Sequence, residues 1–345
     1  MSKNDQELVK QSLFYLPEQI LTSFKESCES FGIIKRKIDA VALFGMGGSG
    51  LGADIARSML GQQILVPFVI VNNYTVPFFV DEKTLCICSS YSGNTEEIVE
   101  AYKELKKRGA QICVITTGGK LGYLAKKDKI PSYIFEPKYN PSGAPRFGIG
   151  YSLGAVLGAL NAYGVLGLNK ASVDLELNRL FPSRKEIKKY VTHFSLLGRF
   201  LAKKFQNRIP IIIGSSHLEG AAHIFANELN ETAKNFAVYF FLPELNHHLL
   251  EGLIKPKTLK KNLFFLLFES ELYHPRIQKR YKITADVFKK QKMPHLVLNP
   301  SRTSRIGEAI DVLLIGCFTA FHLAKLNRVN PLPNPWVDYF KKKMK

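Results

Sequence analysis

Hydroxyl side chains gather in one short stretch of this sequence, and they are the first residues that could do chemistry. Residues 89–95 read Ser-Ser-Tyr-Ser-Gly-Asn-Thr and lie between an apolar run and a stretch with helical periodicity. Ser90, Ser92 and Thr95 therefore fall at a predicted helix start, where hydroxyl groups and helix N–H groups can hold a phosphate monoester without a metal ion. Helix capping is the alternative, but capping needs one such residue rather than several. The stretch favours a phosphate site.

A glycine-rich turn earlier in the chain follows the same plan. Residues 45–52 read Gly-Met-Gly-Gly-Ser-Gly-Leu-Gly and precede an amphipathic helix predicted over 51–60. Gly47, Gly48 and Ser49 would direct backbone N–H groups toward one anion. The glycine spacing also fits a dinucleotide fingerprint, but the next predicted strand ends in Val-Asn-Asn, without the acid that would hold a ribose, and no P-loop lysine follows. The two turns therefore favour a phosphorylated small molecule over a nucleotide.

Three further side chains are suited to proton transfer or charge stabilisation: Glu231, His247 and Arg146. Moving a proton beside a carbonyl needs a positioned carboxylate and a cation near the oxygen, and histidine can act near neutral pH. Two of the three have ordinary alternatives, since Glu231 could be a surface acid paired with Lys234 and Arg146 a loop residue. For His247 the preceding Pro-Glu-Leu-Asn segment favours a general acid, whereas His248 fits a helix start. The adjacent histidines lack metal-ligand spacing, and no metal site is expected.

Strands and helices alternate along both halves of the sequence, and their apolar runs indicate mainly parallel sheets covered on both faces. The first half predicts a helix at 7–31 that Pro17 must kink or divide, strands at 40–45, 64–71, 84–89, 111–116 and 132–135, and helices at 51–60, 94–108 and 149–164. The second half predicts strands at 209–213, 236–242, 262–269 and 295–299, and helices at 184–205, up to 234, 275–291, 304–328 and after 336. Both halves share the order strand, Gly/Ser turn, helix. This α/β pattern predicts two α/β/α sandwich domains, 1–165 and 187–345, with a connector at 166–186.

Length and composition bound the class of protein. The chain has 345 residues, 46% hydrophobic and 22% charged, which suits two folded domains better than a disordered protein. The longest apolar runs fall short of the roughly 18–20 residues of a membrane span, and the polar N-terminus lacks a signal core. These features predict a cytoplasmic protein without a membrane partner. The net charge of +19 invites a nucleic-acid hypothesis, but the lysines are scattered and no nucleic-acid-binding motif accompanies them.

The motifs resemble those of a known enzyme family. The Gly-Met-Gly-Gly-Ser-Gly and Ser-Tyr-Ser-Gly-Asn-Thr turns are similar to those of sugar isomerase (SIS) domains. The segments Asn-Glu-Leu-Asn-Glu-Thr-Ala-Lys at 227–234 and Leu-Pro-Glu-Leu-Asn-His at 242–247 resemble those of the bifunctional phosphoglucose/phosphomannose isomerases. The resemblance spans residues 35–330 and implies two SIS-type domains in a homodimer that needs no cofactor.

The resemblance also implies a reaction and a role for each candidate residue. The enzyme would interconvert glucose 6-phosphate, and mannose 6-phosphate, with fructose 6-phosphate through a cis-enediol. Glu231 would move a proton between C1 and C2, His247 from the other subunit would help to open the ring, and Arg146 would stabilise the enediolate. The residues that would hold the sugar phosphate are Gly47, Gly48, Ser49, Ser90, Ser92, Thr95 and, near the sugar, Thr319.

Two departures from the family pattern and three alternatives remain open. Residues 330–336 offer no clear place for a lysine that the family carries, and extra residues precede Arg146, which bears on substrate preference more than on reaction type. A non-catalytic SIS protein that senses a phosphosugar would keep the turns and need neither Glu231 nor His247. An amino-sugar phosphate isomerase or deaminase is a second alternative, and a nucleic-acid binder is a third.

Overall fold

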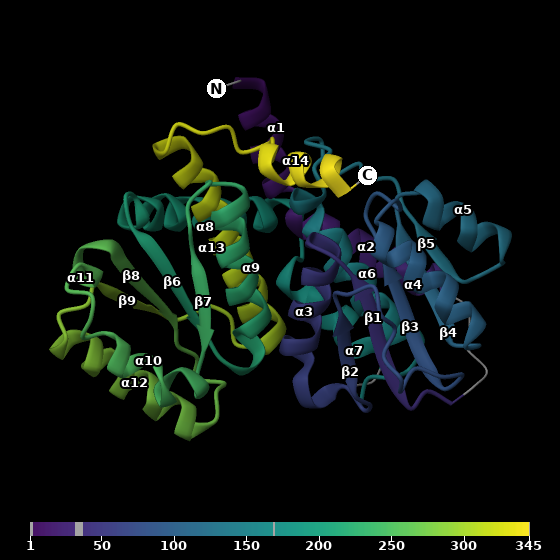
Figure 1. Ribbon diagram of the computed structural model, residues 1–345, viewed down its shortest axis with the longest axis horizontal. Helices are drawn as coiled ribbons and strands as arrows, with labels where there is room; N and C mark the ends of the chain where they lie inside the picture. Colours follow the sequence, from purple (N-terminus) through teal and green to yellow (C-terminus); the bar gives the residue numbers. More distant parts are fainter. Residues whose placement is uncertain (1–2, 32–36, 168–169, 345) are drawn as a thin grey trace. The chain divides into compact units, whose positions relative to one another are not determined.

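The chain folds around two parallel β-sheets, each within its own compact unit (Figure 1). The structure, a computed structural model, describes residues 3–31, 37–167 and 170–344. The first unit is Phe14–Lys188, and the second unit combines Lys189–Lys345 with Met1–Leu13. The α/β class with two sheets confirms the predicted fold class. The prediction assigned the start of the chain to the first domain and residues 166–186 to a connector. The units instead group Met1–Leu13 with the second sheet and residues 166–186 with the first.

The described part of the first unit has a five-stranded parallel sheet. Its order is β2-β1-β3-β4-β5, with bounds β1 Ala40–Gly45, β2 Phe68–Val71, β3 Thr84–Ser89, β4 Gln111–Thr116 and β5 Ser132–Ile134. The central strand β3 is buried along its whole length, as expected for a sheet covered on both faces. Strands β1 and β3 are in register with Gly45 opposite Ser89. The glycine turn and the hydroxyl turn therefore leave the sheet from adjacent positions.

The predicted helix over 7–31 is two helices, α1 (Lys3–Phe14) and α2 (Leu16–Ser30). Pro17 lies in the first turn of α2, where a missing N–H costs no helical hydrogen bond. Helix α3 (Gly48–Leu60) begins earlier than the predicted residue 51, so glycines of the turn form its first helical residues. The prediction began the helix too late because glycine is a poor helix former in isolation.

The predicted connector at 166–186 contains a helix, α7 (Lys170–Leu180). Its apolar stripe is Val173, Leu177 and Leu180, all of them buried. The sequence analysis missed this helix because the glycine and polar residues of this stretch are typical of a connector. The remaining helices of the first unit are α4 Glu96–Lys107, α5 Gly119–Lys127 and α6 Ile149–Ala162.

The second unit has a four-stranded parallel sheet in its described part. Its order is β7-β6-β8-β9, with bounds β6 Ile209–Gly214, β7 Val238–Phe241, β8 Leu263–Phe268 and β9 His295–Leu298. The helices predicted at 184–205, up to 234, at 275–291, at 304–328 and after 336 are all present to within a few residues. The helical bounds are α8 Arg184–Phe205, α9 Glu219–Glu231, α10 Leu249–Gly252, α11 Leu259–Asn262, α12 Pro275–Lys290, α13 Arg305–Leu326 and α14 Pro335–Met344.

Phenylalanines of β8 show how both faces of this sheet are covered. The Phe264 and Phe268 rings lie 5.6 and 6.0 Å from Phe205 of α8 and Phe225 of α9. The intervening Phe265 lies 4.4 Å from Phe288 of α12, on the other face. Successive side chains of a strand point to opposite faces, so β8 is sandwiched between two helical layers.

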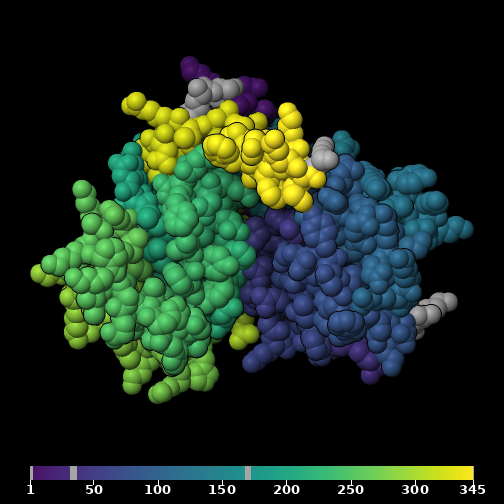
Figure 2. Space-filling view, in the orientation of Figure 1, coloured from purple at the N-terminus to yellow at the C-terminus, as the bar shows by residue number. Residues whose placement is uncertain are grey.

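The last two helices differ in how much of their surface is covered. Helix α13 is long and apolar enough to cross a membrane by length and composition, but 83% of its most apolar window is buried inside the protein, which is typical of a core helix. Helix α14 contains no buried residue and lies on the outside of its unit, coloured yellow in the space-filling view (Figure 2).

Candidate active site

The two predicted turns lie beside one another at the carboxyl edge of the first unit's sheet. The glycine turn leads from β1 into α3, and the hydroxyl turn leads from β3 into α4. The N-cap residues of these helices are Gly47 and Thr95, and neither makes a side-chain cap hydrogen bond. The first N–H groups of both helices are therefore not occupied by these caps. Helix starts of this kind attract anions.

Hydroxyl groups join the two turns. The Tyr91 N–H donates to Ser49 Oγ at 3.0 Å, and Ser90 Oγ lies 2.8 Å from Thr95 Oγ1. Ser49 and Ser90 are buried, whereas Ser92 is exposed. The Thr95 hydroxyl thus contacts Ser90 rather than the amides of α4. Helix capping does not explain this residue, and an anion site at the turns remains a prediction.

Glycine is required at the tip of the hydroxyl turn. Gly93 has φ of +69°, and a Cβ there would lie 1.9 Å from the carbonyl oxygen of Gly118. The Gly93 N–H donates to Ser90 Oγ at 3.1 Å, and the Thr117 N–H and hydroxyl both donate to the carbonyl oxygen of Tyr91. The turn is therefore fixed on the loop that follows β4, and this keeps its hydroxyls in place.

Arg146 lies next to the glycine turn. It belongs to the 3₁₀ turn Pro145–Gly148, and its guanidinium carbon is 4.6 Å from the centre of the Phe147 ring. A Cβ built on Gly48 would lie 3.7 Å from Arg146 Cα, at ordinary van der Waals distance, so the two backbones lie close together. The structure therefore brings Arg146 together with the glycine turn within the first unit.

A buried amide holds the Arg146 segment in place, and sequence analysis missed it. Gln19 of α2 has no exposed surface. Its Nε2 donates to the carbonyl oxygens of Phe147 at 2.9 Å and Tyr139 at 3.0 Å, and its Oε1 accepts from the Gly150 N–H at 3.2 Å. The available signal was a polar residue between Leu16 and Ile20, on the face of α2 that the apolar pattern predicts to be buried.

A second buried amide links the Arg146 segment to the hydroxyl turn. Asn140 Nδ2 donates to the Tyr91 hydroxyl and to the Ala144 carbonyl oxygen, both at 2.9 Å. Burial raises the pKa of Tyr91, so its phenol stays protonated at neutral pH. The glycine turn, the hydroxyl turn and the Arg146 segment are therefore one hydrogen-bonded and packed structure.

Glu231 lies in the second unit as the last residue of α9, three residues before the predicted helix end at 234. Its side chain is partly buried, and its Oε2 accepts from Asn334 Nδ2 at 3.0 Å. Lys234 donates to the Glu231 carbonyl oxygen. The neighbouring Glu228 is buried and accepts from the Thr232 hydroxyl at 2.8 Å, so this acid is engaged within the helix end. Of the two acids, Glu231 has the more accessible carboxylate.

His247 and Thr319 differ in exposure. His247 ends the 3₁₀ turn Glu244–His247 and is exposed, whereas Thr319 of α13 is fully buried and donates to the Ile315 carbonyl oxygen at 2.6 Å. The predicted roles of both residues remain predictions. Across residues 3–31, 37–167 and 170–344, His, Cys, Asp and Glu side chains form no group of three or more that could hold a metal ion.

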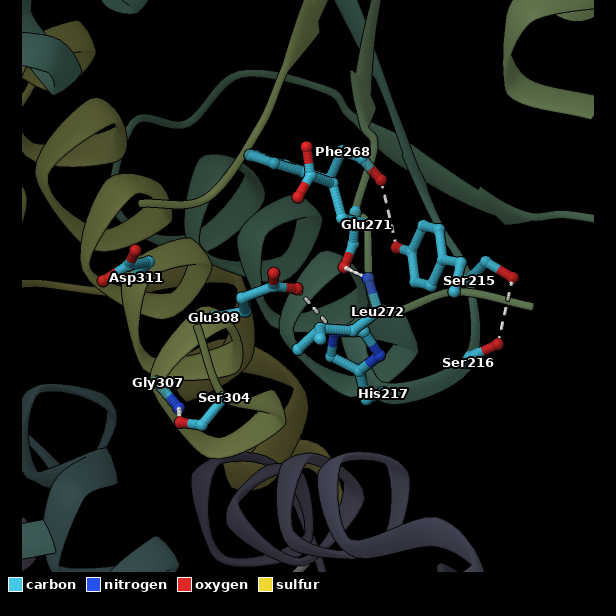
Figure 3. A network of polar contacts seen from close by, with 12 residues as sticks. Ser215, Ser216, His217, Phe268, Glu271, Leu272, Ser304, Gly307, Glu308 and Asp311 are labelled. Carbon is cyan, nitrogen blue, oxygen red and sulfur yellow. Dashed lines mark hydrogen bonds and ion pairs between the residues drawn. The ribbon is translucent and has the colours of Figure 1, made fainter. Parts of the chain in front are cut away.

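The turn after β6 in the second unit carries different groups from its counterpart after β1. His217 Nε2 and Glu308 Oε2 of α13 point toward one another at 2.6 Å, with both side chains buried (Figure 3). The Tyr273 ring packs against His217 with centroids 5.1 Å apart. A buried carboxylate at this turn opposes phosphate binding. The first unit therefore remains the predicted place for a phosphate.

We expect Gln19→Leu to destabilise the first unit by about 2 kcal/mol or more, because it leaves two carbonyl groups and one N–H buried without their partners. Urea unfolding followed by circular dichroism measures this change. The control is Gln11→Leu, the same substitution at an exposed position of α1, which should change the free energy of unfolding by less than about 0.5 kcal/mol. Equal effects of the two substitutions would contradict the positioning role of Gln19.

Comparisons with known proteins agree with this geometry. Residues 34–140 match the SIS domain, and residues 197–344 match the bacterial phospho-glucose isomerase C-terminal SIS domain. A bifunctional phosphoglucose/phosphomannose isomerase from Caldicellulosiruptor bescii is 31% identical, over 97% of this chain and 98% of that protein. An enzyme of the same name from Aquifex aeolicus is 26% identical, over 88% and 90% of the two chains.

Solved structures show the same fold at lower sequence identity. The crystal structure of tagatose-6-phosphate ketose/aldose isomerase from Escherichia coli aligns with a TM-score of 0.71 at 18% identity, over 94% of each chain. The resemblance of the motifs to SIS domains is thus confirmed along the sequence and in the fold. The chain belongs to the bifunctional phosphoglucose/phosphomannose isomerase family, and it is an isomerase built from SIS domains.

Proposed function

We propose that this protein interconverts fructose 6-phosphate with glucose 6-phosphate, and with mannose 6-phosphate, through a cis-enediol. Family membership is the observation that carries the proposal, because the relatives are named for both activities and align with the chain over nearly their whole length. The paired turns support a phosphorylated substrate, since hydroxyls and helix N–H groups meet there at one edge of the sheet.

In the proposed complex, the phosphate lies between the two turns of the first unit. Backbone N–H groups at Gly47, Gly48 and the start of α4 donate to its oxygens, and the hydroxyls of Ser49, Ser90, Ser92 and Thr95 complete the shell. Hydrogen bonds to a charged acceptor are stronger than neutral ones, so a few such contacts suffice to hold a phosphate monoester. Thr319 would lie nearer the sugar.

The proposed chemistry is a series of proton transfers. His247 donates a proton to the ring oxygen as the bond between that oxygen and C1 breaks, and the C1 hydroxyl gives its proton to solvent, from which His247 is reprotonated, so that the open-chain aldose has a C1 carbonyl. Glu231 takes the proton from C2, and negative charge develops on the former carbonyl oxygen, where the Arg146 guanidinium stabilises it. Glu231 then returns the proton to C1 while the O2 hydroxyl proton passes to O1, which leaves the ketose with its C2 carbonyl. The carboxylate ends in its starting state, and no oxidant or metal is consumed.

The proposal includes a cytoplasmic homodimer with shared active sites, in which His247 acts in the site of the neighbouring subunit. The exposed position of His247 supports this part of the proposal, because an exposed side chain is available to a second copy. Closed two-fold dimers are the commonest oligomers of soluble proteins.

Glu231→Gln should lower turnover of fructose 6-phosphate by about 10²–10⁴-fold, because the amide cannot accept the proton. A coupled assay that detects glucose 6-phosphate measures the loss. Glu271→Gln, the same change at an exposed acid of the second unit, serves as the control and should leave turnover unchanged. Full turnover by Glu231→Gln would contradict the mechanism. Binding of fructose 6-phosphate without turnover in the unmodified protein would instead indicate a phosphosugar sensor, and ammonia release from glucosamine 6-phosphate a deaminase.

Shared active sites make a separate prediction for mixed dimers. A dimer of one Glu231→Gln subunit and one His247→Ala subunit has one site in which both residues are unchanged, so co-expression of the two inactive variants should restore about a quarter of the unmodified activity. The coupled assay on the co-purified mixture measures it. If both residues act within one subunit, every site in the mixture carries a substitution and activity stays at background.

A further inference from the structure

We infer that Asn334 is a positioning residue that orients the Glu231 carboxylate for proton transfer. The inference rests on the proposed function, in which Glu231 is the base. Asn334 Nδ2 donates to Glu231 Oε2 at 3.0 Å, and the two residues are far apart in the chain. Asn334 lies in the segment between α13 and α14, where the departures from the family pattern were noted.

The chemistry of Lys234 determines which end of the Asn334 amide faces Glu231. Lys234 Nζ lies 2.8 Å from Asn334 Oδ1, and an ammonium group can only donate hydrogen bonds. The amide oxygen must therefore face Lys234, and the NH₂ group must face the carboxylate, which only accepts when ionised. The order Lys234, Asn334, Glu231 is a chain of donors and acceptors that excludes the flipped amide.

The backbone at Lys234 supports this arrangement. Lys234 has φ of +51°, in the left-handed region, just beyond the end of α9. Its ammonium group also donates to the Glu231 carbonyl oxygen, at the helix end where a cation is favourable. Lys234 thus contacts the backbone of Glu231 and donates to the Asn334 side chain.

The segment that carries Asn334 is held along its length. Asn327 Nδ2 donates to the Ala233 carbonyl oxygen at 3.1 Å, and Asn330 Nδ2 donates to Asp5 Oδ2 of α1 at 2.6 Å. At the start of α14, the Asn334 carbonyl oxygen accepts from the Asp338 N–H at 2.9 Å. These contacts fix Asn334 next to the end of α9, so its amide is a preorganised donor.

A donor on Oε2 limits rotation of the carboxylate about its last bond. Orientation matters in an aldose–ketose isomerisation because one carboxylate must reach both C1 and C2 during a single turnover. Misplacement of a catalytic group by about 1 Å can cost about 100-fold in rate. Loss of the Asn334 donor should therefore lower kcat rather than weaken substrate binding, because the phosphate is held by the other unit.

Two substitutions separate positioning from a merely structural role, with fructose 6-phosphate as substrate in the coupled assay. Asn334→Ala should lower kcat about 10-fold or more and leave KM within about twofold. Asn334→Asp keeps the size of the side chain and the acceptor for Lys234, but it replaces the donor with a second carboxylate. It should therefore lower kcat at least as much as Asn334→Ala. Asn262→Ala and Asn262→Asp, at an exposed asparagine of α11, are the matched controls and should leave kcat unchanged.

The outcomes distinguish this inference from the proposed function. If Asn334 only holds the C-terminal segment through Lys234, Asn334→Asp will resemble the unmodified protein, which would overturn the inference. A rise in KM without a fall in kcat would also overturn it. Glu231→Gln is assayed beside these variants. Loss of activity in Glu231→Gln with normal kcat in both Asn334 variants refutes the inference alone, whereas full activity in Glu231→Gln refutes the proposed function itself.

Discussion

The hydrogen bond from the Tyr91 N–H to Ser49 Oγ is the contact on which the candidate site depends. It joins the turn after β1 to the turn after β3, which the strand register has already placed side by side. The Tyr91 hydroxyl accepts from Asn140, which belongs to the loop that leads to Arg146. Buried polar groups are costly unless they are paired, so each of these bonds constrains the next. Three loops from distant parts of the sequence are thereby held at one place.

The two units share the order strand, turn and helix, but the turns carry different chemical groups. In the first unit the turns present hydroxyls and helix N–H groups, which suits a phosphate. In the second unit, His217 of the turn after β6 pairs with the buried Glu308. This buried carboxylate opposes the binding of a phosphate. Under the proposed function the first unit holds the substrate, and the second supplies the base Glu231. This division explains why the glycine turn has no catalytic acid or base of its own.

Sequence analysis predicted the sheets and the turns because their signals are local. Continuous apolar runs such as 84–89 predict strands buried on both faces, and the adjoining Gly/Ser turns predict helix starts. The end of α9 was placed too late because a left-handed Lys234 leaves no trace in residue periodicity. Gln19 and Asn334 were missed for a different reason. Their partners lie 128 and 103 residues away, and tertiary structure alone determines such pairs.

The location of the bound phosphate tests the central claim most directly. A crystal structure of the protein with fructose 6-phosphate should place the phosphate within hydrogen-bonding distance of the Ser90 and Thr95 hydroxyls and of the N–H groups at Gly47 and Gly48. It should also leave the His217–Glu308 pair intact. A phosphate bound instead at the turn after β6, with that pair broken, would contradict the assignment of the two units.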